Sequence, residues 1–415
     1  MAPEKGSLLA KVDYPLYTVR SLGDRYFVVA GGGGSAKTGV CNAISVFELK
    51  SVGDSCLASC VHSHDTGSQA TMNSSAFYDG RNHVYAAGMD DECHLFSLKY
   101  KVITPGKKKN NDSEGKEGAR KRRESGKDIQ TTNDITKQVT FEIQKLKHIK
   151  TDFAKEGSFQ KVVQFNKCQS LLGTGGADGF VRIWKYPDLK KMHEIKAHDN
   201  EIDDLDFTPD GKQLVSVSRD KNAYIWSTKD GKRHTGLVWP AKHSDKYRYR
   251  ACRYGVVSDK DKVNLYTIHI PCKRDVKPLP CFLSLWDSST YRVKRVSQTG
   301  TEILSALSVS DDGIYIGVGT ISGSVSVYIA FSLQRLYHIK AAHGIFVTGL
   351  EFMPSSEGSR QITGGQDLTL LSISADNTIK IHQVAARGSY SILWVIVGFL
   401  VIICLFFWLI ATLGL

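Results

Sequence analysis

A hairpin pattern that repeats along the chain constrains the fold more than any other feature. In its full form an alternating strand leads into a tight turn with an aspartate, and a tryptophan stands six residues later at the end of the next strand. The two clearest copies are residues 171–184 and 214–226. Their tryptophans are 42 residues apart (226 − 184), within the 40–45 residues typical of a four-stranded propeller blade. The repeat therefore predicts an all-β propeller.

Degraded copies extend the repeat to seven. The same six-residue offset joins Asp90 to Phe96, Ser322 to Tyr328 and Asp376 to His382, and two further strand ends fall at Phe47 and Trp286. We therefore expect a seven-bladed WD40-type β-propeller, in which each blade buries its apolar face against the next. Longer intervals between copies predict insertions near residues 101–135 and 236–280.

Two histidines stand where repeats of this type carry a Gly-His pair. A lone histidine invites a catalytic interpretation, but a buried hydrogen-bond partner for the turn aspartate or a nearby hydroxyl is the simpler one. The residues to which we assign such a structural role are Asp178, Trp184, His198, Asp220, Trp226 and His343. Since no nucleophile, base and orienting group stand at interpretable spacings, we expect no covalent enzyme chemistry.

The chain ends in a strongly apolar segment. No charged residue follows Arg387, and residues 391–413 are almost wholly Ile, Leu, Val, Phe and Trp. About 20 such residues cross a hydrocarbon core as a helix, so residues 389–415 are predicted to be a single transmembrane tail anchor. Basic residues precede this segment and almost no chain follows it, which predicts a cytosolic propeller over residues 1–388. The expected ends and interfacial residues of the span are Ile392, Trp394, Trp408 and Leu413.

Half of the formal net charge of +12 lies in one insert. Between Lys101 and Lys127 ten Lys or Arg residues stand against four acids, which gives +6. The low hydrophobicity of this stretch predicts a solvated, disordered insert over about residues 103–135. A nuclear-localisation, nucleic-acid or anionic-lipid patch stays open as the alternative. The nine cysteines are scattered without a CxxC pair, which indicates reduced thiols rather than disulfides or a zinc site.

One connection departs from the repeat. In blade one, residues 30–44 read AGGGGSAKTGVCNAI, about seven residues longer than the turn of the 171–184 hairpin. Four consecutive glycines give the backbone φ freedom at an entropic cost, and a two-residue turn has no need of them. Residues 31–38 nearly match a phosphate loop, but an alternating strand follows where a phosphate loop requires a helix, which argues against autonomous nucleotide binding. Two interpretations of this segment stay open: a flexible surface loop and a loop that contacts a partner.

Five parts of the sequence carry a resemblance to a known family. They are residues 31–39, 62–66 with 70–73, 161–163 with 174–179, 247–253 and 328–334. Over essentially its whole length, terminal anchor included, the chain resembles the endoplasmic-reticulum exchange factors that load GTP onto the Sar-family GTPase and start COPII coat assembly. The resemblance implies a guanine-nucleotide exchange factor in the endoplasmic reticulum membrane, with a Sar-family small GTPase and, more remotely, other COPII-site organising proteins as partners.

The resemblance also assigns roles to the long loop of blade one, which in that family holds a potassium ion through backbone carbonyls and meets the GTPase. It implies no required cofactor but a bound potassium ion between Gly31 and Asn42. Gly39 would let the backbone approach, Val40 would be an apolar wedge, and Asn42 would tie the loop or ligate the ion. The implied contact residues are Gly31, Gly32, Gly33, Gly34, Ser35, Ala36, Lys37, Thr38, Gly39, Val40 and Asn42, with His64, Asp65 and Asn73 as weaker candidates.

Two other functions stay open from the residues alone. A DNA-binding transcription regulator fits the net charge and the insert, but the chain lacks helix-turn-helix or zinc-finger spacings, and a membrane helix would have to be released before nuclear entry. DNA is therefore the less expected partner. A passive WD40 scaffold would bind partners without releasing nucleotide, and an exchange assay with a purified GTPase separates it from an exchange factor.

Overall fold

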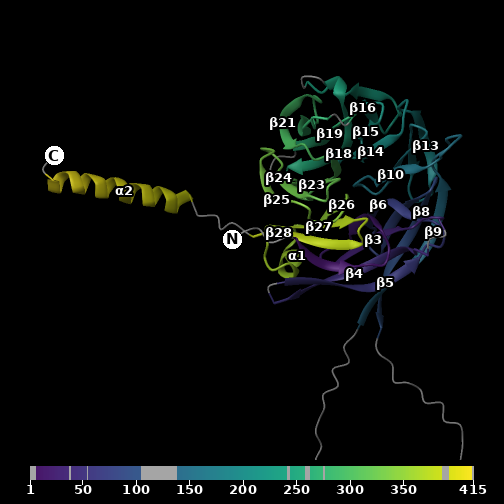
Figure 1. Ribbon diagram of the computed structural model, residues 1–415, viewed down its shortest axis with the longest axis horizontal. Coiled ribbons are helices and arrows are strands. Elements are labelled where there is room, and N and C mark those ends of the chain that lie inside the picture. Colours follow the sequence, from purple (N-terminus) through teal and green to yellow (C-terminus); the bar gives the residue numbers. More distant parts are fainter. Residues whose placement is uncertain are drawn as a thin grey trace, which may run out of the picture.

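Seven four-stranded sheets form the body of the protein. The computed structural model describes residues 6–36, 39–53, 55–103, 138–240, 244–257, 262–273, 276–385 and 392–413. Within these residues the sheets are antiparallel and stand around a ring, as Figure 1 shows. The first strand of each blade contacts the first strand of the next, so these strands line the centre of the ring. The predicted seven-bladed propeller is confirmed.

The first four blades follow one another along the chain. Blade one contains β2 (Leu16–Ser21), β3 (Tyr26–Gly32), β4 (Asn42–Val52) and β5 (Ser55–Asp65). Blade two contains β6 (Thr71–Tyr78), β7 (His83–Met89), β8 (Glu92–Ile103) and β9 (Gln138–Lys150). Blade three contains β10 (Gln160–Phe165), β11 (Leu171–Gly176), β12 (Phe180–Lys185) and β13 (Lys190–Lys196). Blade four contains β14 (Ile202–Phe207), β15 (Gln213–Ser218), β16 (Ala223–Ser227) and β17 (Arg233–Gly236).

The last three blades include two short helices. Blade five follows the 3-10 helix η1 (Ser244–Lys246) and contains β18 (Tyr247–Val257), β19 (Lys262–Pro271), β20 (Cys281–Asp287) and β21 (Val293–Gly300). Blade six contains β22 (Leu304–Val309), β23 (Tyr315–Thr320), β24 (Val325–Ile329) and β25 (Arg335–Ile339). Blade seven contains β26 (Val347–Phe352), α1 (Glu357–Ile362), β27 (Leu368–Ser374) and β28 (Thr378–Val384).

The strand ends predicted from the repeat all fall on the third strand of a blade, one in each of the seven. The insertion predicted near residues 236–280 is wrong in part, because β18 and β19 of blade five occupy residues 247–257 and 262–271. The basic insert predicted over about 103–135 joins β8 to β9. Beyond residue 103 it lies outside the described residues.

The N-terminal strand closes the ring. β1 (Ser7–Lys11) pairs antiparallel with β28 and is the outer strand of blade seven, with Ser7 opposite Ile381 and Lys11 opposite Thr378. In Figure 1 the purple start of the propeller accordingly lies beside the yellow strands of its end. A strand from one end of the propeller thus completes the blade formed by the other, which fastens the two ends of the ring together.

Apolar side chains between neighbouring blades hold the ring together. Phe27 of blade one packs in one cluster with Leu371 and Ile373 of blade seven, and Ile44 of blade one packs in another with Tyr85 of blade two. Each of these side chains is almost completely buried. Since burying one such side chain contributes about 1.5–3 kcal/mol, the packing of blade on blade makes a stiff frame for the loops that it carries.

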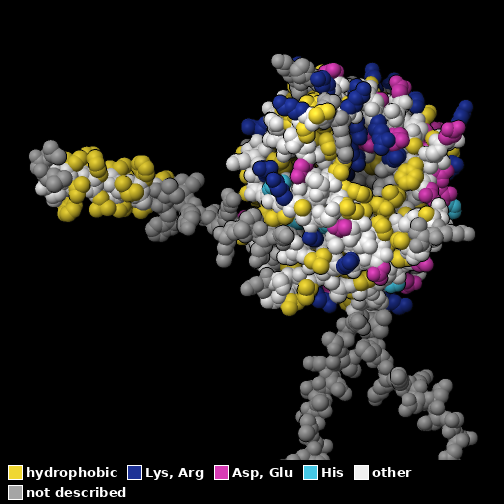
Figure 2. All heavy atoms as spheres, viewed as in Figure 1, with side chains coloured by type: hydrophobic (Ala, Val, Ile, Leu, Met, Phe, Trp, Pro, Cys, Tyr) yellow, Lys and Arg dark blue, Asp and Glu magenta, His cyan; other side chains and the backbone are white. Residues whose placement is uncertain are grey.

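A C-terminal helix follows the propeller in the sequence. α2 (Ile392–Leu413) exposes large apolar side chains such as Phe399, Phe406 and Trp408. Figure 2 shows the helix covered with yellow, apolar side chains. No helix in the described part of the chain has both the length and the hydropathy of a membrane span. The predicted transmembrane anchor of residues 389–415 therefore stays a prediction. The side chains of Ile392, Trp394 and Leu413 lie outside the described residues.

Candidate functional site

The glycine-rich loop predicted as the contact site connects β3 to β4. It spans residues 33–41, whereas only residues 177–179 separate β11 from β12 in blade three. Blade one is not alone in this, because residues 272–280 between β19 and β20 form a connection of the same length. Lys37 and Thr38, two of the predicted contact residues, lie outside the described residues.

Two of the four consecutive glycines are required by packing at the base of the loop. A Cβ atom on Gly31 would lie 1.9 Å from the carbonyl oxygen of Pro15, and the next amide, that of Gly32, donates a hydrogen bond of 2.9 Å to the same oxygen. Gly32 has a φ of +137°, and a Cβ there would lie 2.1 Å from Oδ1 of Asn42. The expectation that the fold has no need of these glycines is therefore wrong for Gly31 and Gly32.

The two other described glycines with positive φ shape the exposed part of the loop. Gly34 has a φ of +71° and Gly39 a φ of +78°, and a Cβ at either position would meet only open space. Backbone conformation, and not crowding, therefore favours glycine here. Gly33 is half-buried, while Ser35 and Ala36 are exposed at the tip.

Asn42 ties the loop to its neighbouring turn. Its side chain, 3% exposed, accepts a hydrogen bond from the Gly34 amide at 2.8 Å through Oδ1. Its Nδ2 donates to the carbonyl oxygens of Gly34 at 3.0 Å and Gly67 at 2.7 Å. The Thr66 amide also donates to the Asn42 carbonyl at 3.0 Å. Of the two roles predicted for Asn42, these contacts describe the one of tying the loop.

Val40 lies at the other end of the loop, directly before Cys41 and Asn42. Its side chain is half-buried and packs against the apolar cluster between blades one and seven. Part of its apolar surface is therefore already used within the propeller. Its role as a wedge against a partner stays a prediction.

The three weaker candidates do not share one environment. Asp65, at the exposed end of β5, accepts a hydrogen bond from the Gly67 amide at 2.8 Å and so shapes the turn that Asn42 holds. His64 packs its ring on Phe96 of blade two, with the ring centroids 5.8 Å apart. Only Asp65 joins the loop of blade one through this hydrogen-bonded turn.

Asn73, the third of these candidates, lies on β6, the inner strand of blade two. Its Nδ2 donates to the Gln160 carbonyl at 2.9 Å, and Nε2 of Gln160 donates back to its Oδ1 at 3.0 Å. The Thr151 hydroxyl then donates to Oε1 of Gln160 at 2.6 Å. Asn73 therefore belongs to a network that joins blade two to blade three.

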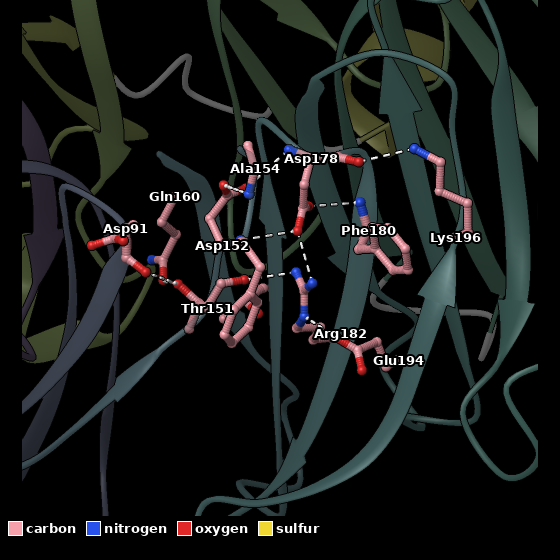
Figure 3. A network of polar contacts seen from close by, with 12 residues as sticks. Asp91, Thr151, Asp152, Ala154, Gln160, Asp178, Phe180, Arg182, Glu194 and Lys196 are labelled. Carbon is pink, nitrogen blue, oxygen red and sulfur yellow. Dashed lines mark hydrogen bonds and ion pairs between the residues drawn. The ribbon is translucent and has the colours of Figure 1, made fainter. Parts of the chain in front are cut away.

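Arg182 is the centre of the same network, shown in Figure 3. Its side chain is 2% exposed and donates to Asp178, to Glu194 and to the Thr151 carbonyl, each at 2.7 Å. Burial raises the pKa of the Asp178 carboxyl, but hydrogen bonding and the charge of Arg182 outweigh it, so that the net pKa is lowered. Sequence reasoning assigned Asp178 a structural role but did not find Arg182.

The aromatic rings of Phe153 and Phe180 pack on the same guanidinium. Its central carbon lies 4.8 Å from one ring centroid and 5.0 Å from the other. Such cation–π contacts are favourable where the cation is withdrawn from water. The two rings and the three polar partners together hold Arg182 in one position.

The histidines and tryptophans of the repeat make structural hydrogen bonds. His198 contacts Asp220 at 2.9 Å and the Ser216 hydroxyl at 2.8 Å, and Trp226 donates to the same hydroxyl at 2.9 Å. In blade three Trp184 donates to Thr174 at 3.0 Å. The tryptophan bonds join the second and third strands of a blade, and His198 joins the connection before blade four to that blade.

His343 has the corresponding place in blade seven. It contacts the Ser372 hydroxyl at 2.7 Å, and His382 contacts that hydroxyl at 2.8 Å in the place that tryptophan takes in blades three, four and five. Burial lowers the pKa of both histidines, that of His382 to about 3. Both rings are therefore neutral at physiological pH.

The donor groups of the loop suit a monovalent cation better than a divalent one. Its described residues, 31–36 and 39–42, carry no acidic or basic side chain, so the available donors are main-chain carbonyls, the Ser35 hydroxyl and the Asn42 amide. Carbonyl oxygens replace the hydration shell of potassium, whereas calcium is held largely through carboxylates. No group of three or more His, Cys, Asp or Glu side chains in the described ranges could hold a metal ion. The residues present thus fit potassium.

Comparison with known proteins gives the fold and the family. The family described as "WD domain, G-beta repeat" matches residues 189–227. The crystal structure of the WD40 β-propeller domain of Doa1 superposes with a TM-score of 0.55 over 93% of this chain and 98% of that chain; at 12% identity this likeness shows the fold alone.

Two mammalian relatives match nearly the whole chain. The mouse guanine nucleotide-exchange factor SEC12 is 40% identical over 94% of this chain and 93% of its own length, and the rat protein of that name is 39% identical over the same shares. A plant protein, the SEC12-like protein 1 of Arabidopsis thaliana, is 31% identical over 47% of this chain and 46% of its own length. The chain belongs to the SEC12 family of guanine nucleotide-exchange factors.

Proposed function

We propose that this SEC12-family chain releases GDP from a Sar-family small GTPase at the endoplasmic reticulum membrane and so initiates COPII vesicle budding. The mammalian relatives that match nearly the whole chain are named exchange factors. The observation that carries the proposal is the β3–β4 loop, whose exposed tip stands on a base held by Asn42, Gly31 and Gly32. A loop built in this way can enter a partner without being displaced itself.

Exchange requires no covalent step by this chain. A GTPase releases GDP when its partner binds the nucleotide-free form more tightly than the GDP-bound form. We propose that the propeller holds the displaced GTPase segments while the tip of the loop, Ser35 to Gly39, reaches toward the nucleotide site. Asn42 keeps the base of the loop in place, and the positive φ values of Gly34 and Gly39 let the backbone turn closely against the GTPase.

A potassium ion in the loop is part of the proposal. The carbonyls of the described loop residues, with the Ser35 hydroxyl, would hold it, and Asn42 would orient those carbonyls through its hydrogen bonds to Gly34. When bound, the ion would supply a positive charge that offsets the mutual repulsion of the carbonyl oxygens. Exchange activity measured in potassium and in sodium buffers of equal ionic strength tests this part.

Membrane anchoring would set where the GTPase is activated. Sar-type GTPases expose an amphipathic helix on GTP loading, and a fixed exchange factor would decide which membrane that helix enters. The exposed apolar side chains of the 22-residue helix α2 support residues 389–415 as the anchor. Alkaline extraction of cell membranes tests it: the full chain should stay in the membrane fraction, and a chain ending at residue 388 should be released.

Deletion of residues 33–40 tests the function of the loop. We expect GDP release from a purified Sar-family GTPase to be abolished while the propeller still folds with a melting temperature only a few degrees lower, because Val40 is the one described deleted residue that packs against the apolar core. A second variant, in which residues 33–41 are replaced by the blade-three turn Ala177-Asp178-Gly179, controls for hairpin closure. Unchanged GDP release in both folded variants would refute the proposal. Binding of the GTPase without any nucleotide release by the parent chain would favour a passive scaffold.

A further inference from the structure

The inner strands of all seven blades carry a β-bulge at the same place. Each strand shifts register against its neighbour after its first or third residue, and the extra residue lies at the start of the strand. A bulge redirects the side chain of its extra residue. The seven extra residues all line one cavity of about 180 Å³ in the central channel, and they are Tyr17, Met72, Lys161, Asp203, Arg250, Ser305 and Thr348.

This cavity opens on the side of the propeller that carries the β3–β4 loop. Leu16, at the start of the inner strand β2, pairs with Gly31, near the end of β3. The loop that follows β3 therefore leaves the sheet at the same end as the bulges. Asn73, one of the predicted contact residues, also lines the cavity.

Most of the charged side chains around the cavity are paired. Arg20 contacts Glu351 at 3.3 Å, Lys161 contacts Glu201 at 2.9 Å and Arg253 contacts Asp204 at 2.6 Å. A fourth carboxylate, Asp203, is shared by three arginines, Arg219, Arg248 and Arg250. These contacts join six cations to four carboxylates, a surplus of two positive charges. Asp206, deeper in the channel, has its pKa raised to about 6, chiefly by burial, and counting it as charged still leaves a surplus of one.

Arg250 is the least satisfied of these cations. Arg248 makes the closest contact with Asp203, and Arg219 also contacts Glu201 at 3.2 Å. The one ion pair of Arg250 within the described residues is with Asp203 at 3.8 Å, which is too long for a hydrogen bond. Its side chain is 32% exposed, and a guanidinium has five N–H donors in a planar fork. Arg250 is therefore placed to donate to a ligand in the cavity.

We propose that the loop-side mouth of the channel binds a small oxyanion through Arg250, with Lys161 and Asn73 beside it. Guanidinium groups bind carboxylates and phosphates with paired hydrogen bonds. The cavity of about 180 Å³ has room for one phosphate or carboxylate group together with water. The oxyanion is a free phosphate or a carboxylate that the partner GTPase inserts. The second source rests on the proposed function.

The first arm of the test measures the binding of free phosphate. Isothermal titration of the full chain in nanodiscs with inorganic phosphate at low salt compares the parent with Arg250→Gln. The matched control is Arg295→Gln, which removes the same charge from the exposed outer strand β21 of the same blade. Phosphate binding by the parent that weakens at least tenfold in Arg250→Gln and stays unchanged in Arg295→Gln supports a free-phosphate site.

The second arm measures the affinity of the same three proteins for a nucleotide-free Sar-family GTPase as salt is raised. A loss of at least fivefold at low salt in Arg250→Gln, with a shallower salt dependence and no loss in the control, supports a carboxylate from the partner. The proposal is overturned if Arg250→Gln, with an unchanged melting temperature, changes neither phosphate nor GTPase binding. If the parent chain fails to release GDP, the proposed function fails, while the phosphate arm is still decided on its own result.

Discussion

The hydrogen bonds of Asn42 allow a quantitative prediction about the loop. Replacing Asn42 by alanine removes three hydrogen bonds, two to Gly34 and one to Gly67, and leaves the carbonyl oxygen of Asn42 bonded to the Thr66 amide. The loop would then lose its only side-chain ties to the neighbouring turn among the described residues. We expect a looser loop on an intact propeller.

The magnitude follows from the number and exposure of these bonds. A neutral hydrogen bond contributes about 0.5–1.5 kcal/mol net, and Gly34 and Gly67 are exposed enough for water to replace part of the loss. We therefore expect Asn42→Ala to destabilise the protein by about 1.5–3 kcal/mol. With an unfolding entropy of about 2.1 cal/mol/K per residue and roughly 350 folded residues, this lowers the melting temperature by about 2–4 °C. Asn42→Asp should cost at least as much, because it places a carboxylate oxygen against two carbonyls.

Hydrogen exchange of the loop peptide is the decisive assay. The amides of residues 33–36 and 66–70 should lose protection in Asn42→Ala, and GDP release from the GTPase should slow because the loop no longer keeps its bound shape. Asn222→Ala is the matched control, since the exposed side chain of this asparagine makes one hydrogen bond of 3.4 Å, to the Asp220 carbonyl, in the corresponding turn of blade four. If Asn42→Ala and Asn222→Ala show the same loop protection and melting temperature, Asn42 does not tie the loop.

Three further predictions concern the frame around the loop. Gly31→Ala should lower the free energy of urea unfolding by about 2 kcal/mol or more, because its Cβ would lie 1.9 Å from the Pro15 carbonyl oxygen. Gly39→Ala should lower it by about 1 kcal/mol, because only the positive φ opposes a side chain there. Equal losses would contradict the packing argument. Arg182→Met should destabilise the protein by about 3–5 kcal/mol and Arg182→Lys by less, because only the first leaves the buried Asp178 carboxylate without its cation. Calorimetry that finds the methionine variant as stable as the parent would refute this. Burial holds the pKa of His382 at about 3, so between pH 6.5 and pH 3 only the unfolded state binds a proton at this histidine. The free energy of unfolding should therefore fall by up to about 1.4 kcal/mol per pH unit as the pH is lowered through this range. Unfolding measured at each pH should show a smaller slope for His382→Gln.

The blades could be predicted because each is a local unit. The turn aspartate and the aromatic residue six positions later lie on one hairpin, so a short stretch of sequence contains both partners, and all seven predicted strand ends fall on third strands. The closure of the ring could not be predicted in this way. β1 pairs with β28, which lies more than 360 residues further along the chain. The five residues of β1, SLLAK, contain no pattern that would predict this pairing.

The sequence allowed the side chains of the candidate site to be predicted, but not the main-chain groups to which they bind. Asn42 stands out in the sequence as the polar residue that ends the loop, and its tying role is one of two that the sequence suggests. Its partner Gly67 and the Pro15 carbonyl contribute main-chain oxygens, for which residue identity gives no signal. Arg182 was missed for a different reason: in the sequence it is one basic residue in an alternating strand, and its burial depends on Phe153 from a separate connection.

The loop and the channel mouth differ in chemistry, and this difference implies a division of roles. Apart from Lys37, which lies outside the described residues, the loop is uncharged, so most of its contacts with a partner depend on close approach and little on ionic strength. Arg250 and its neighbours carry a positive surplus, and charges at the rim of an interface act mainly on the rate of encounter. Salt should therefore slow association with the GTPase and leave nucleotide release from the formed complex nearly unchanged. Because each blade starts its inner strand beside the end of its second strand, the same geometry that repeats the blades brings these two surfaces to one side of the propeller.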